Sequence, residues 1–213
     1  MKTIPFNAET LREITEVLKN GGVIAHPADT CFGLTADINS IKGYKKIQMI
    51  KGRDYKKPMS IMISVAEQLK MEDYVKLDDF SSYIAYKIFP GAITLVLPKG
   101  PKMPKHYFPD LSTVGLRVPL HNITQDILTA FKGPLITTSA NLSGTGLCFS
   151  HEEVIENFKN SKDQPDLIIK GTAQHYDLAS TVAEVKKDHV YIIRKGPVTK
   201  SQLESILGVK IKE

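Results

Sequence analysis

The feature that most constrains this chain is a series of short apolar segments that alternate with segments of helical periodicity. Short apolar runs bounded by Gly, Pro and small polar residues are typical of buried strands. They predict strands at residues 23–25, 59–65, 92–97, 114–118, 135–138, 167–169, 181–185 and 190–193. Apolar spacing and capping residues predict helices between Asn7 and Gly21, at 38–50, 79–89, 123–131 and 199–207, and one that begins with a capping box at Ser150. Because the last strands follow one another, we expect a mixed sheet in an α/β or α+β domain.

Length and composition fit one folded domain, which we place at residues 8–207. The chain has 213 residues, of which 42% are hydrophobic and 24% charged, and we find no repeat and no linker-like segment. The net charge of 28 − 23 = +5 suits an anionic ligand such as a nucleotide or RNA, but it proves neither. Two distant cysteines and the lack of a long apolar stretch favour a reducing compartment, the cytoplasm, and no contact with membranes.

A basic segment at residues 51–58 is the first candidate for a ligand site. Lys51, Arg53, Lys56 and Lys57 lie within seven residues, between a predicted helix and a predicted strand. Arginine and lysine side chains bind phosphate oxygens, and Gly52 gives the backbone freedom to approach a ligand. The alternative, a basic loop that only contacts solvent, stays open.

Small polar residues follow two of the predicted strands. Ser139 and Asn141 come directly after the strand at 135–138, at the carboxyl end where open α/β sheets bind ligands. Asp29 and Thr30 follow the strand at 23–25, and Gly33 beyond them permits close backbone approach. Both segments can also be read as ordinary polar turns.

Arg117 lies within the apolar strand at 114–118, where an unpaired guanidinium is unfavourable. Its partner is either a structural carboxylate or the carboxylate of a ligand. We expect Arg117 to be largely buried on a cavity wall, without a protein carboxylate that satisfies it fully. Arg194 likewise ends an apolar strand.

Several kinds of catalytic site are not indicated. The chain has no P-loop sequence, no nucleophile elbow, and no histidines at metal-ligand spacing, so we expect neither a triad nor a metal site. Cys31 fits a packed small side chain better than a nucleophile.

Seven short segments, taken in order, resemble the YrdC-type threonylcarbamoyl-AMP synthase family, in its short, single-domain form. The resemblance runs from about Leu11 to Leu207 and rests on Pro27-Ala28-Asp29-Thr30 with Gly33-Leu34, Lys51-x-Arg53 with Lys57-Pro58, Pro90-Gly91 with Thr94-Leu95, Gly115-Leu116-Arg117-Val118-Pro119, Thr138-Ser139-Ala140-Asn141 with Ser143-Gly144, Ser180-Thr181, and Ile193-Arg194 with Gly196. Met62 departs from the family, since many relatives have a threonine-contacting histidine there.

The resemblance implies a YrdC-like twisted mixed sheet around a concave basic cavity. It also implies that L-threonine, bicarbonate and ATP form threonylcarbamoyl-AMP and pyrophosphate, for modification of tRNA next to the anticodon. By resemblance, the residues that carry the chemistry are Lys51, Arg53, Lys57, Ser139 and Asn141; those that bind ATP are Lys51, Arg53, Lys57, Thr113, Asn141 and Arg194; and those that hold threonine are Thr30, Arg117, Ser139 and Ser180.

ATP is thus expected as a substrate, and Mg²⁺ on its phosphates is plausible although no carboxylate pair dictates a metal site. The implied partners are downstream tRNA threonylcarbamoyl transferase proteins, and direct binding of tRNA stays open. Two alternatives remain: an inactive RNA-binding module of the same fold, and a carbamoyl-transfer component of a larger maturation enzyme, which the short chain and the lack of zinc-type cysteine pairs disfavour.

Overall fold

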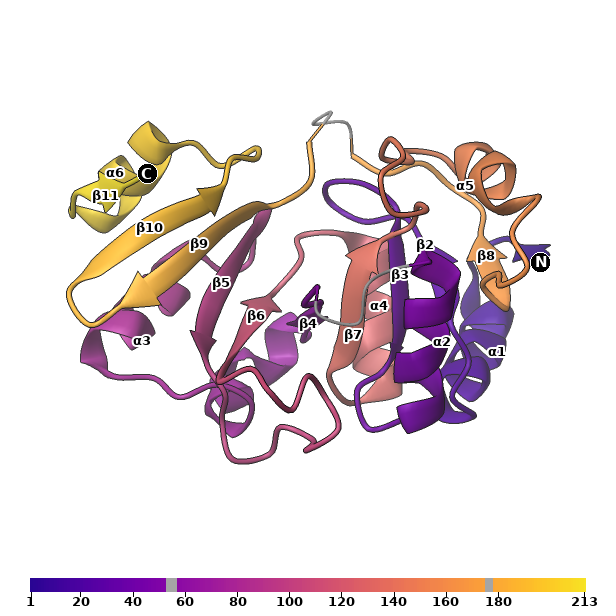
Figure 1. Ribbon diagram of the computed structural model, residues 1–213, viewed down its shortest axis with the longest axis horizontal. Helices are drawn as coiled ribbons and strands as arrows, with labels where there is room; N and C mark the ends of the chain where they lie inside the picture. Colours follow the sequence, from indigo (N-terminus) through magenta and orange to yellow (C-terminus); the bar gives the residue numbers. More distant parts are fainter. Residues whose placement is uncertain (53–56, 175–177) are drawn as a thin grey trace.

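A mixed sheet of eleven strands runs through the described part of the chain (Figure 1). The computed structural model describes residues 1–52, 57–174 and 178–213. Across the sheet, the strand order is β1-β8-β2-β3-β7-β4-β6-β5-β9-β10-β11. The strands are β1 (Lys2–Ile4), β2 (Ile24–His26), β3 (Gly33–Asp37), β4 (Ser60–Met62), β5 (Ile93–Pro98), β6 (Thr113–Arg117), β7 (Leu135–Ser139), β8 (Leu167–Ile169), β9 (Thr181–Lys186), β10 (His189–Arg194) and β11 (Ile211–Lys212). Parallel and antiparallel pairs both occur, as the order of the predicted elements indicates.

Helices cover both faces of the sheet. They are α1 (Ala8–Lys19), α2 (Ile41–Lys51), α3 (Asp79–Ile88), α4 (Asn122–Phe131), α5 (His151–Phe158) and α6 (Lys200–Leu207), with the 3₁₀ helix η1 (Val65–Asp73). Helices α1 and α4 pack together on one face over Ile24, Met62 and Leu135, while α2 packs on β3 from the other face. At the end of the sheet formed by β9, β10 and β11, α3 packs against α6 (Figure 1).

Local sequence explains where the helix next to the cationic segment begins and ends. The predicted helix at 38–50 begins only at Ile41, because the Ser40 side chain caps it by accepting from the Gly43 backbone N–H. It continues to Lys51 and ends there because Gly52 takes up the left-handed conformation, with φ 52°. Lys51 is therefore the last residue of α2, and not part of the loop in which the sequence placed it.

Every predicted strand is present, with boundaries shifted by a few residues. The strand predicted at 59–65 ends at Met62, because Ser64 caps η1. Strand β3 was not predicted, since Gly, Thr and Asp make its sequence resemble a loop. Its pairing with β2 and β7 supplies the hydrogen bonds that its own propensity does not. None of the described helices is long and apolar enough to cross a membrane.

Candidate active site

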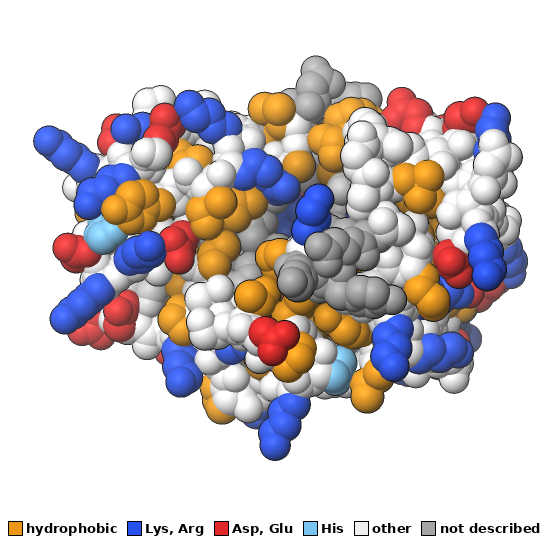
Figure 2. Space-filling model, in the orientation of Figure 1, with side chains coloured by type: hydrophobic (Ala, Val, Ile, Leu, Met, Phe, Trp, Pro, Cys, Tyr) orange, Lys and Arg blue, Asp and Glu red, His pale blue; other side chains and the backbone are white. Residues whose placement is uncertain are grey.

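A cavity of about 270 Å³ brings together most of the residues that the sequence singled out. Predicted site residues on its wall are Thr30, Lys51, Lys57, Arg117, Ser139, Asn141, Ser180 and Arg194. Figure 2 shows the hollow near the middle of this face, with basic side chains beside it. The described lining residues include four basic residues and no Asp or Glu.

The cavity extends across the sheet and is not a crevice at one edge of it. Ser139 ends β7 and Arg117 ends β6, and these two strands run in opposite directions because β4 is antiparallel to β7 and parallel to β6. Ser60 of β4 lies between them, beside Thr137 on one strand and Gly115 on the other. The expectation of a site at one carboxyl edge is therefore correct for Ser139 but does not describe the whole cavity.

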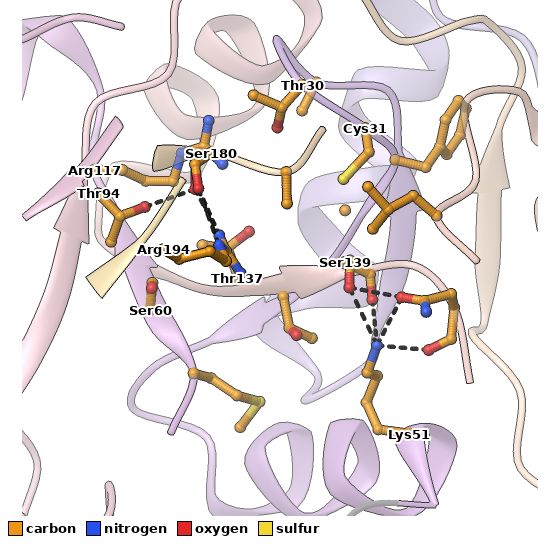
Figure 3. Close-up of a pocket in the computed structure, with 18 of the residues that line it drawn as sticks. Thr30, Cys31, Lys51, Ser60, Thr94, Arg117, Thr137, Ser139, Ser180 and Arg194 are labelled. Carbon is orange, nitrogen blue, oxygen red and sulfur yellow. Dashed lines mark hydrogen bonds between the residues drawn. The ribbon is translucent and has the colours of Figure 1, made fainter. Parts of the chain in front are cut away.

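One wall is organised by the amino group of Lys51. This side chain is 4% exposed, and its Nζ donates to the backbone oxygens of Ser139 at 2.7 Å and Asn141 at 2.5 Å. It also lies 3.0 Å from Asn141 Oδ1, which in turn accepts from the Ser139 hydroxyl at 2.6 Å. The three residues therefore form one hydrogen-bonded group, of which Figure 3 labels Lys51 and Ser139.

A second hydrogen-bonded group surrounds Ser180 on another side of the cavity (Figure 3). The Ser180 hydroxyl lies 3.0 Å from Thr94 Oγ1 and accepts from Arg194 Nη2 at 3.1 Å. Arg194 also donates to the Ser180 backbone oxygen, from Nη2 at 2.8 Å and from Nε at 3.1 Å. Arg194 thus fixes the position of Ser180, a role that the sequence did not indicate.

Arg117 is 8% exposed on the cavity wall, as expected, and it has a partial carboxylate partner. Its Nη2 donates to Asp29 Oδ1, while Asp29 Oδ2 accepts from the Leu120 backbone N–H at 3.1 Å. Its buried Nε has no hydrogen-bond partner. The carboxylate therefore does not satisfy the guanidinium fully, and Asp29, which the sequence placed in a ligand-orienting turn, holds Arg117 in place.

Two of the residues predicted to bind ATP, Arg53 and Thr113, are not among the described residues that line this cavity. Arg53 lies outside the described residues. Thr113 begins β6, four residues before Arg117, so about 13 Å of strand separates the two Cα atoms. Thr113 lines a different cavity, beside Leu97 and Lys186.

Sequence reasoning gave no role to several polar lining residues that are embedded in strands. Thr94, Thr137 and Ser60 line the cavity, and Thr94 is only 2% exposed. The available signal was a polar side chain within an apolar strand, and the same kind of signal identified Arg117. Cys31 also lines the cavity, but burial raises the pKa of its thiol, so it stays protonated and weakly nucleophilic.

Metal-ligand chemistry finds no support in the described part of the chain. Three or more His, Cys, Asp or Glu side chains do not gather anywhere among the described residues.

Met62 stands where many relatives have a histidine. It is buried in the apolar cluster beneath α1 and α4, so its surroundings suit an apolar side chain.

Comparisons with known proteins show which proteins this chain is similar to. Residues 16–196 match the family model of the Sua5, YciO and YrdC proteins, which is described as "Telomere recombination". A putative threonylcarbamoyl-AMP synthase from Methanocaldococcus jannaschii is 30% identical over 93% of both chains. A threonylcarbamoyl-AMP synthase from Buchnera aphidicola is 37% identical over 70% of this chain and 85% of its own.

The structure also superimposes on a solved relative. Sua5 of P. abyssi, in a crystal structure described as complexed with L-threonine, matches with a TM-score of 0.86 at 28% identity. The match covers 99% of this chain and 61% of that one. The family model covers most of the chain and the fold matches that of a solved relative, so the chain belongs to the Sua5/YciO/YrdC family.

Proposed function

We propose that this chain is an L-threonylcarbamoyladenylate synthase, a nucleotidyltransferase that uses ATP, L-threonine and bicarbonate. The observation that carries the proposal is the cavity itself. One side presents Lys51 and Asn141, and another presents Arg117 and Ser180, so a nucleotide and an amino acid have separate polar groups within one cavity.

The chemistry requires alignment and charge neutralisation, and no protein nucleophile. The threonine amine adds to the carbon of bicarbonate and water leaves, which gives a carbamate. A carbamate oxygen then attacks the α-phosphorus of ATP while the bond to the β-phosphate oxygen breaks and pyrophosphate departs. Because negative charge accumulates on the phosphates, fixed cations and hydrogen-bond donors stabilise the transition state.

At the nucleotide end, Lys57 is an exposed cation of the lining, and Ser139 and Asn141 provide neutral contacts. Lys51 holds the backbone of Ser139 and Asn141 and brings its positive charge near the phosphates. We keep Arg53 in this group on the family resemblance, and Arg194 as a ligand that also holds Ser180. Thr113 is left out, since it lines another cavity.

At the amino-acid end, Arg117 would receive the threonine carboxylate. Its unpaired Nε–H supplies a donor that Asp29 leaves unused. Thr30, Ser139 and Ser180 offer hydroxyls to the rest of the amino acid.

The remaining components follow from these substrates. Mg²⁺ would enter on the phosphates of ATP, as part of that substrate, because the described lining offers cations and neutral groups and no carboxylates. The adenylate product is a reactive mixed anhydride, so the proteins that transfer threonylcarbamoyl to tRNA in the cytoplasm are the expected consumers.

The test is pyrophosphate release measured with each substrate omitted in turn. We expect release only when ATP, L-threonine and bicarbonate are all present. Arg117→Lys should raise the KM for threonine far more than the KM for ATP, because lysine cannot form the bidentate contact. Release that ignores threonine, or RNA retention without any release, would contradict the proposal.

A further inference from the structure

His26 is a buried histidine that the proposed chemistry leaves unused. It ends β2, is 1% exposed, and packs against Thr124 at the start of α4. Its Nδ1 lies 3.0 Å from the Pro27 backbone oxygen, which also accepts from the Thr124 hydroxyl. A carbonyl oxygen only accepts, so Nδ1 carries the proton of the neutral ring and Nε2 carries a lone pair. Among the described residues, His26 Nε2 and Arg117 Nε are the buried side-chain atoms without a hydrogen-bond partner.

The sheet register directs this lone pair toward the cavity. Gly33 of β3 is the register partner of His26, and a Cβ added at Gly33 would lie 3.2 Å from His26 Nε2 and 3.7 Å from Thr137 Oγ1. Gly33 and Thr137 both line the cavity. The missing side chain of Gly33 therefore leaves His26 Nε2 and the Thr137 hydroxyl facing one small gap.

The surroundings keep the ring uncharged. Burial, together with the nearby His121 and Arg117, lowers the pKa of His26 from 6.5 to about 4, and the hydrogen bond to the Pro27 oxygen opposes this only in part. His26 therefore presents a neutral acceptor at every pH where the enzyme is expected to work.

The ligand at this end of the cavity needs such an acceptor. The described lining has Lys51, Lys57, Arg117 and Arg194 but no carboxylate, so an ammonium group meets only cations and neutral groups. Neutral oxygens and nitrogens with free lone pairs are the groups that can hold it.

We propose that His26 is a positioning residue for the amino-acid substrate, whose Nε2 accepts from the Thr137 hydroxyl and so turns the Thr137 oxygen toward the substrate's amino group. This inference rests on the proposed function, since it assumes an amino acid in the cavity. Movement of Thr137 across the Gly33 gap would make the contact, and the contact would satisfy the buried acceptor in the bound state.

Two conservative variants of His26 separate this role from a structural one. The amide N–H of His26→Asn can still donate to the Pro27 oxygen but cannot reach toward Thr137, whereas the longer His26→Gln places an oxygen near the position of Nε2. By calorimetric titration with L-threonine, we expect His26→Asn to weaken affinity about tenfold or more and His26→Gln to stay within about threefold. ATP affinity should be unchanged in both.

The coupling to Thr137 is tested by a double variant. Thr137→Val alone should weaken threonine binding, and adding His26→Asn should cause no further loss. Thr35→Val is the control, because Thr35 is the register partner of Thr137 but its hydroxyl donates to the Ile136 backbone oxygen. That variant should lose stability and keep its affinity for threonine.

The outcomes distinguish the two claims. Better threonine binding by His26→Asn than by His26→Gln, or additive losses in the double variant, would overturn the role of His26 and leave the proposed function intact. Failure of the unaltered protein to bind threonine at all would refute the proposed function, and the inference with it.

Discussion

Lys51 provides the most direct link between the stability of this fold and its site. Its Nζ is buried and lies within hydrogen-bond distance of the backbone oxygens of Ser139 and Asn141 and of Asn141 Oδ1. In Lys51→Met the apolar stem is retained and these acceptors lose their donor. We expect the variant to be destabilised and to lose ATP affinity together, because one amino group serves both the turn and the cavity.

The magnitude follows from the contacts. Hydrogen bonds to a charged donor contribute ~1.5–3 kcal/mol each, and a buried acceptor left unpaired costs ~1–3 kcal/mol. These effects overlap at one amino group, whose burial is itself unfavourable, so we expect a net loss of about 3 kcal/mol in the free energy of unfolding. For a chain of this size, that loss lowers Tm by roughly 6–12 °C.

Urea and thermal unfolding of Lys51→Met are compared with those of Lys57→Met. Lys57 also lines the cavity but is exposed, so its removal should change stability by less than about 0.5 kcal/mol. Both variants should bind ATP more weakly. A Lys51→Met protein that unfolds at the same urea concentration as the unaltered protein would refute the structural role assigned to Lys51.

Three further predictions follow from the cavity and its supports. Gly196→Ala would place a Cβ 2.3 Å from the Thr181 backbone nitrogen, so we expect a loss of ~1–3 kcal/mol in urea unfolding and weaker threonine binding through displacement of Ser180. Thr94→Val removes the hydroxyl 3.0 Å from that of Ser180, and steady-state kinetics should show a higher KM for threonine with an unchanged KM for ATP. Because the pKa of His26 is lowered to about 4, the unfolded chain binds more protons than the folded chain between pH 6.5 and 4. The free energy of unfolding should therefore fall as pH drops through this window, by up to ~1.4 kcal/mol per pH unit. The fall should be less steep in His26→Gln.

Residue type alone singled out several side chains that the structure brings to one cavity. Lys51, Ser139 and Asn141 are polar residues beside apolar segments, and the structure joins them by hydrogen bonds. Arg117 was identified because a guanidinium within an apolar strand requires a partner. The positions of these residues could be anticipated because a buried polar or charged side chain needs a hydrogen-bond partner in any fold.

Other contacts depend on which strands pair and in which register, and these pairings cannot be read from the local sequence pattern. Thr137 faces Ser60 because β4 pairs with β7 in one register, and a shift of one residue would turn either side chain to the opposite face. The pairing of Asp29 with Arg117 joins residues 88 positions apart. Strand β3 was missed for the same reason, since its hydrogen bonds come from neighbours distant in sequence, such as those of β7.

The central claim concerns the product formed in the cavity, and mass spectrometry of a single reaction mixture tests it most directly. The protein is incubated with ATP, L-threonine and ¹³C-labelled bicarbonate, and the nucleotide products are examined. The account predicts an adenylate that contains threonine and one labelled carbon, with pyrophosphate in equal amount. An adenylate of threonine without the labelled carbon, or AMP and pyrophosphate formed without any threonine adduct, would contradict it.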